Sequence, residues 1–457
     1  MCSSDLFKIT IKFKITNKFN KFNIFVILNF IVILNIINYF NENIDLYPIS
    51  YLILSVVILI SLVFNKNKLT TIVGVYFFIL FLTLIPITEV ILGVREYLYS
   101  GNFLRVSLHT HEYLHKTFFV ILFQMSLVST FLFLSKEINY PKYKSEKFNK
   151  ILWVVIIVIL SYLSNPTHMI TAYRYGADDF STGGSFLIAG WAMIFLIAFS
   201  YYAFKTKLKA NFDVIFSIII IIFWLLHGNR SEILGIVALL FLLRYDTNTS
   251  LKIKLKWVVL LTVLGASFQI IGVIRGLDVG KVDMLMSFLG GDFSLIFDGS
   301  SFGIPHISTV TAIDYSLLSI IYSVDEGHLN YHYGLSVFDY LMRTLPAGIP
   351  LPFERPVDLA ALIAPMTNAK GGAHFAGEAY WNGSILGVYI FTFLVMSLIT
   401  YFNNKMSSST LVGIFGFALI MLTPRVVWYG NIYLYKVLLV FIILLIISKV
   451  KKISVKN

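Results

Sequence analysis

The residues with the clearest potential for chemistry lie together in one stretch that ends at residue 383. It reads Lys-Gly-Gly-Ala-His-Phe-Ala-Gly-Glu-Ala-Tyr-Trp-Asn-Gly over positions 370–383. If the stretch is helical, His374 and Glu378 share one face because they are four residues apart. Histidine and carboxylate side chains are common proton-transfer groups, so both are candidates for a general base, and the sequence does not decide between them. Tyr380 and Asn382 add hydrogen-bonding groups for a substrate, and the glycines allow a ligand to approach the backbone.

A second set of candidates consists of arginines at the ends of apolar segments. Arg230 follows Asn229 in a turn, and the helix expected after the turn directs its free N–H groups toward the same point, which favours an anion. Arg275 and Arg425 also end apolar segments, and Pro424 is expected to break its helix directly before Arg425. Arginine suits bidentate binding of phosphate or carboxylate. We therefore expect these arginines to bind an anionic group at one face. The alternative is that they form ion pairs or extend toward lipid headgroups.

The amino-acid composition indicates which type of secondary structure positions these side chains. Of the 457 residues, 58% are hydrophobic and only 13% are charged. A soluble domain carries about 25% charged residues, so a soluble enzyme is excluded. Apolar runs approach the length of about 20 residues that a helix needs to cross a bilayer, whereas barrel strands are shorter and alternate in polarity. The sequence therefore predicts an all-α polytopic membrane protein with about 12 transmembrane helices. The predicted segments are residues 22–40, 47–64, 69–93, 115–135, 150–165, 184–204, 212–227, 231–244, 256–275, 384–402, 411–424 and 432–448.

Lysines are concentrated in every second connection between these segments, which predicts their orientation. Basic connections face the cytoplasm, so both termini are expected to be cytoplasmic in a multi-pass protein of the plasma (inner) membrane. Residues 1–21 are then a cytoplasmic segment, and residues 1–6 resemble a translated sequencing-adapter end. The net charge of +12 follows from this orientation, and no nucleic-acid partner is expected. The single cysteine, Cys2, excludes disulfides and multi-cysteine metal sites, and no other ligand pattern predicts a metal or cofactor.

The predicted spans form one integral membrane domain over residues 1–457, with a large extracytoplasmic loop over residues 276–383. A loop of that length is usually functional. Within it, residues 337–345 have helical spacing of apolar side chains. Such an amphipathic helix is expected to lie on the membrane surface or to cap a cavity.

The architecture and two motifs resemble the Wzy-type O-antigen or oligosaccharide repeat-unit polymerases. The motifs are Gly-Asn-Arg-Ser at 228–231 and Gly-Glu-Ala-Tyr-Trp-Asn-Gly at 377–383, the latter at the end of the long loop. The family more often has Asn-Phe-Gly where this chain has Asn382, Gly383 and Ser384. The resemblance implies a fold like that of the C-type glycosyltransferases (GT-C). It also implies transfer of a growing glycan from undecaprenyl pyrophosphate onto a new lipid-linked repeat unit at the outer face.

The same resemblance implies the roles of the candidate residues. Arg230, Arg275 and Arg425 would bind the diphosphate, and Glu378 would lie at the acceptor. This chemistry needs cations for the leaving group and a base for the acceptor hydroxyl, but no metal and no cofactor. The expected partners are undecaprenyl-pyrophosphate-linked oligosaccharide and membrane lipid, and the sequence leaves open whether a polysaccharide chain-length regulator also binds.

Two other functions are compatible with much of the sequence. An O-antigen ligase shares the architecture and the chemistry but transfers glycan to a lipid A core. A flippase or transporter for lipid-linked oligosaccharide would perform no chemistry, and it is expected to have paired halves with matching broken helices. The predicted arginines on one face and the single long loop favour the polymerase over the transporter.

Overall fold

The computed structural model describes residues 21–41, 46–64, 68–92, 111–134, 311–344, 359–363, 373–405 and 410–430, with single or paired positions at 155, 290, 352–353 and between 434 and 446. The described residues form helices and no strands, as the composition predicts. Predicted segments between 150 and 275, as well as Arg230, Arg275 and Asn229, lie outside the described residues.

The first part of the chain forms apolar helices close to the predicted bounds. They are α1 (Lys21–Phe40), α2 (Tyr47–Phe64), α3 (Lys68–Phe81), a short 3-10 turn (Leu82–Leu84), α4 (Ile85–Ile91) and α5 (His111–Leu134). The segment predicted over 69–93 is helical over Lys68–Ile91, with a 3-10 turn between its two α-helices. Pro86 accounts for the division, since it has no N–H with which to continue the hydrogen-bond ladder.

The second part of the chain adds short and long helices. These are α13 (Thr311–Asp325), α14 (Leu335–Thr344), α15 (Leu359–Ile363), α16 (Phe375–Lys405) and α17 (Thr410–Tyr429). The helix predicted over 337–345 is confirmed by α14. The predicted break at Pro424 is wrong, because α17 continues through it to Tyr429. In an apolar helix such a proline is tolerated where neighbouring elements surround the freed backbone groups, and Pro424 is buried.

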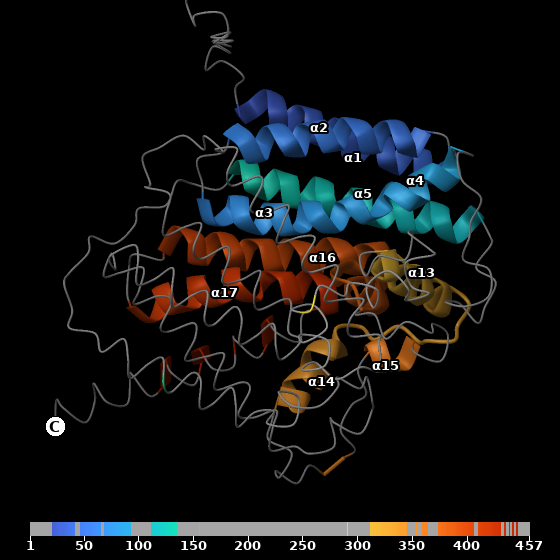
Figure 1. Cartoon of the computed structure of the whole chain (residues 1–457). Coiled ribbons are helices and arrows are strands. Elements are labelled where there is room, and N and C mark those ends of the chain that lie inside the picture. The colour runs from blue at the N-terminus through green and yellow to red at the C-terminus, as the bar shows by residue number, and fades with distance from the viewer. Residues whose placement is uncertain are drawn as a thin grey trace, which may run out of the picture.

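Helix α5 is the centre of the described structure and contacts α1, α2, α3, α13 and α16. Figure 1 shows the long helices with nearly parallel axes in stacked layers, while α13, α14 and α15 lie together on the α16 side, away from α1 and α2. The buried side chains are mainly aromatic and aliphatic, such as Phe77, Phe118 and Phe375. Two helices among the described residues, Tyr113–Phe133 and Phe375–Lys405, are long and apolar enough to cross a membrane.

Candidate functional site

Helix α16 is broken, and its first part carries the candidate residues. Gly383 and Ser384 have non-helical backbone angles, so residues 375–382 form a separate short helix, here named the half-helix. A Cβ atom on Gly387 would lie 2.1 Å from the carbonyl oxygen of Ala379. In a straight helix residues eight positions apart are separated by about 12 Å. The half-helix therefore folds back against the start of the following long part.

His374 lies immediately before the half-helix and caps it. Its Nδ1 accepts the backbone N–H of Ala376 at 2.9 Å. A nitrogen that accepts an N–H carries no hydrogen, so the remaining ring proton must be on Nε2. Burial also lowers the pKa of the His374 imidazole well below its usual value, which keeps the ring neutral. Nε2 is buried and has no hydrogen-bond partner among the described residues, so it is a donor without an acceptor.

Glu378 lies fully buried one turn later, in the first turn of the half-helix. The hydroxyls of Ser336 and Tyr435 lie 3.2 and 3.3 Å from its Oε1. Gly430, just after α17, leaves room for the other oxygen: a Cβ there would lie 2.8 Å from Oε2. The positive end of the helix dipole also favours a negative charge at this position. Hydroxyls from two separate parts of the chain thus hold the carboxylate as a hydrogen-bond acceptor, and Gly430 leaves space beside it.

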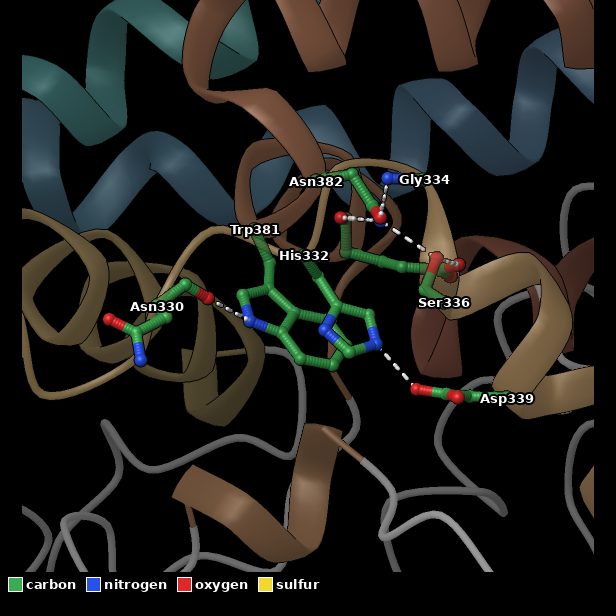
Figure 2. A network of polar contacts seen from close by, with 8 residues as sticks. Asn330, His332, Gly334, Ser336, Asp339, Trp381 and Asn382 are labelled. Carbon is green, nitrogen blue, oxygen red and sulfur yellow. Dashed lines mark hydrogen bonds and ion pairs between the residues drawn. The ribbon is translucent and has the colours of Figure 1, made fainter.

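Asn382 joins the half-helix to residues 330–340, here named the docking segment. Its Oδ1 accepts the N–H of Gly334 at 2.8 Å, and its Nδ2 donates to Ser336 Oγ at 2.7 Å and to the carbonyl of Glu378 at 2.8 Å (Figure 2). The amide is therefore occupied within the protein. The expected role of Asn382 in substrate binding stays a prediction, while its structural role is to hold the docking segment.

Trp381 and His332 make a second connection between the same two parts. Their rings stack with centroids 4.0 Å apart and planes 8° apart, as Figure 2 shows. Trp381 Nε1 donates to the carbonyl of Asn330 at 3.0 Å, and the N–H of His332 donates to the carbonyl of Trp381 at 3.0 Å. His332 Nε2 in turn contacts the carboxylate of Asp339 on α14. Backbone, indole and ring-stacking contacts thus fix the docking segment along the half-helix, and the contact with Asp339 orients the His332 ring.

Tyr380 contacts α13 through its hydroxyl. Its hydroxyl donates to Asp325 Oδ1 at 2.8 Å, and Lys116 Nζ lies 3.0 Å from Oδ2 of the same carboxylate. The partly buried ion pair joins α5 to α13, and the hydroxyl of Tyr380 adds α16. The substrate-binding role expected of Tyr380 stays a prediction, because the observed contact of its hydroxyl is with Asp325.

Three non-glycine residues with positive φ surround this site. They are Tyr333, His374 and Ser384, with φ of 48°, 50° and 54°. This left-handed conformation costs about 1–2 kcal/mol for a residue with a Cβ atom. Strained backbone of this kind is concentrated at functional sites, where surrounding contacts hold it. Here one strained residue precedes the half-helix, one follows it and one lies in the docking segment.

Arg425 is half-buried in α17 and makes interactions within the protein. It lies on the helix whose end contacts the site, because the carbonyl of Trp428 accepts the N–H of His374 at 3.2 Å. Arg230, Arg275 and Asn229 lie outside the described residues, so the convergence of the arginines stays a prediction. Among the described residues, no three metal-ligating side chains gather.

The sequence did not predict Ser336, Tyr435 or the pair of His332 and Asp339 as parts of the site. The available signal for Ser336 was weak: a single hydroxyl in an apolar amphipathic pattern. Tyr435 lay within a predicted membrane span, where tyrosine is common near the interface. Neither position is adjacent in sequence to Glu378, so spacing along the chain carries no information about these contacts.

In comparison with known proteins, no family model, no curated protein and no solved structure matches this chain.

Proposed function

We propose that this chain is an integral membrane glycosyltransferase that polymerises lipid-linked oligosaccharide repeat units at the outer face of a bacterial plasma membrane. The observation that carries the proposal is the buried Glu378 carboxylate, held as an acceptor at the end of a broken apolar helix beside His374. The motif resemblance supplies the kind of transfer, and the site supplies a base suited to it.

A membrane location is supported by apolar side chains on the outside of several helices. Phe30 on α1, Leu52 on α2 and Leu394 on α16 are 59%, 65% and 58% exposed. Exposed apolar area costs about 25 cal/mol per Å² in water, whereas hydrocarbon tails surround it without this cost. About twelve crossings, with both termini in the cytoplasm, remain part of the proposal.

In the proposed reaction, the oxygen of the acceptor hydroxyl attacks the anomeric carbon of the donor glycan. Glu378 accepts the proton that this hydroxyl loses. The bond from that carbon to the pyrophosphate oxygen breaks, and undecaprenyl pyrophosphate leaves with the bonding electron pair. His374 is assigned the complementary role, because its Nε2–H can donate to a substrate oxygen but cannot accept a proton. Arg230, Arg275 and Arg425 are proposed to stabilise the charge that develops on the diphosphate.

Glu378→Gln tests the proposal, because the amide keeps the shape of the side chain but cannot act as the base. In a strain that lacks this gene, the variant is expected to leave surface polysaccharide as a single repeat unit. The wild-type gene is expected to restore a ladder on a gel. For purified protein, we expect transfer to fall by about 10²–10⁴-fold, which is the usual contribution of a general base.

Glu326→Gln is the matched control, because Glu326 is exposed and contacts Tyr113 outside the half-helix. It should retain the full ladder. A full ladder with Glu378→Gln at normal protein levels would exclude the assigned base. Long polymer that remains on the lipid carrier in the deletion strain would instead indicate a ligase. Repeat units retained at the cytoplasmic leaflet would indicate a transporter.

A further inference from the structure

Ser336 is the buried contact between α14 and the proposed base. It lies in the first turn of α14, is fully buried, and is 42 residues from Glu378 along the chain. Most of the polar contacts around it connect the docking segment to the half-helix. Its surroundings are therefore part of the site, although the residue belongs to the long loop.

The direction of the hydrogen bonds around Ser336 follows from the groups that can only donate. The backbone N–H of Gly334 can only donate, so the atom of Asn382 that it contacts must be the amide oxygen. The amide nitrogen then faces Ser336 Oγ and donates to it at 2.7 Å. Because Ser336 Oγ accepts this bond, its own hydrogen is free for Glu378 Oε1, 3.2 Å away. The relay therefore runs from Asn382 through Ser336 to Glu378.

The geometry points to Ser336 as a positioning residue that holds Glu378 as a hydrogen-bond acceptor for proton transfer. This inference rests on the proposed function for its kinetic consequence. Ser336 reaches the carboxylate only while the docking segment lies against the half-helix. The stack of His332 on Trp381 and the bond from Gly334 to Asn382 hold it there. The long loop thus supplies part of the machinery that orients the base.

Ser336→Ala is the first test, measured with purified protein and lipid-linked oligosaccharide substrate. A hydroxyl bond to a charged group is worth more than a neutral one, so we expect kcat to fall about tenfold. KM should change by less than about twofold, because Ser336 acts through Glu378 and not on substrate. Ser129→Ala is the matched control, since Ser129 is equally buried but donates only to the carbonyl of Met125 in its own helix.

A second readout needs no transfer activity. N,N′-dicyclohexylcarbodiimide reacts with protonated carboxyl groups in apolar surroundings, and a carboxylate that loses a hydroxyl donor takes up a proton more readily. We expect the adduct on Glu378, measured by mass spectrometry of its peptide, to increase several-fold in Ser336→Ala. The Ser129→Ala protein should be labelled like the wild type, and Glu378→Gln should show no adduct at this position.

The two readouts separate the possible failures. Unchanged labelling of Glu378 in Ser336→Ala would overturn the inference, whatever the activity. A raised KM with unchanged kcat would also overturn it, because Ser336 would then contact substrate. If wild-type protein transfers no glycan but the labelling increases as expected, the proposed function fails while the hold of Ser336 on Glu378 stands.

Discussion

The buried hydroxyls of helix α5 and the buried polar side chains of the half-helix form hydrogen bonds in different ways. In α5, the hydroxyls of Thr117, Ser126 and Ser129 donate to carbonyls four residues earlier, at 2.7, 2.8 and 2.7 Å. In the half-helix, Glu378 and Asn382 pair with side chains or backbone 42–57 residues away. The hydrogen bonds within α5 satisfy hydroxyls inside one helix, whereas those of the half-helix connect separate elements.

The difference separates polar residues that fill a helix from those that build a site. A hydroxyl that bonds its own helix needs no partner from elsewhere, so it places no condition on how the chain folds around it. A carboxylate that depends on Ser336 and Tyr435 is satisfied only when three parts of the chain meet. Buried networks of this kind specify one arrangement, because a lost partner leaves a costly unpaired group.

The largest effect is expected from Gly387→Ala, which disrupts the fold that creates the half-helix. The new Cβ would meet a backbone oxygen at 2.1 Å, and backbone cannot move aside as a flexible side chain can. We expect a loss of about 3 kcal/mol, the upper end for an overpacked site. The measurement is the melting temperature in detergent micelles.

Gly383→Ala is the control for this change, since its Cβ would meet nothing within 4 Å and its φ of 173° is open to alanine. It should alter stability by less than about 0.5 kcal/mol. Equal melting temperatures for the two variants would show that the half-helix does not fold back against the long part of α16.

A smaller effect on stability, but a specific one on activity, is expected from Gly430→Ala. Gly430 has φ of 88°, and a Cβ there would meet Glu378 Oε2 at 2.8 Å. The flexible carboxylate can move, so the change should displace the base more than it unfolds the protein. Backbone strain of about 1–2 kcal/mol is added in either case.

Gly327→Ala is the matched control, because its φ is 75° and its Cβ would meet nothing within 4 Å. Both variants should lose similar stability, and only Gly430→Ala should lose glycan transfer. Equal glycan transfer by the two variants would show that the space at Gly430 is not needed for the position of Glu378.

The helices were largely predictable from local patterns. The segments expected over 22–40 and 47–64 match α1 and α2 because a long apolar run in a chain of this composition has few alternatives to a helix. The one contradicted prediction and the one irregular turn both lie at prolines. Pro86 coincides with a division of the helix, whereas Pro424 lies within a continuous one. Whether a proline ends a helix depends on the packing around it, which the sequence does not state.

The site was predictable only to the extent that it is local. His374, Glu378 and Asn382 lie within nine residues, and their chemical types were sufficient to select them. Ser336 and Tyr435 reach Glu378 across 42 and 57 residues, a proximity that depends on how the helices pack. The sequence also left His374 and Glu378 equal as candidates for the base. The bond from Ala376 to His374 Nδ1 places the ring proton on Nε2, and for this reason the proposed reaction assigns the base to Glu378.

The smallest effect on stability and transfer is expected from Ser126→Ala in α5. It allows a direct comparison of the two regions, because the same substitution is proposed at Ser336. Ser126 is fully buried, and its hydroxyl donates to the carbonyl of Leu122. Since that carbonyl also belongs to the hydrogen-bond ladder of the helix, removal of the hydroxyl leaves no orphan partner. We expect stability to change by less than about 0.5 kcal/mol and transfer to stay at the wild-type rate. Ser336→Ala removes one hydrogen-bond partner from the amide of Asn382 and one from the carboxylate of Glu378. A loss in Ser126→Ala as large as in Ser336→Ala would show that the hydroxyls of α5 also join separate elements, and the distinction between the two regions would fail.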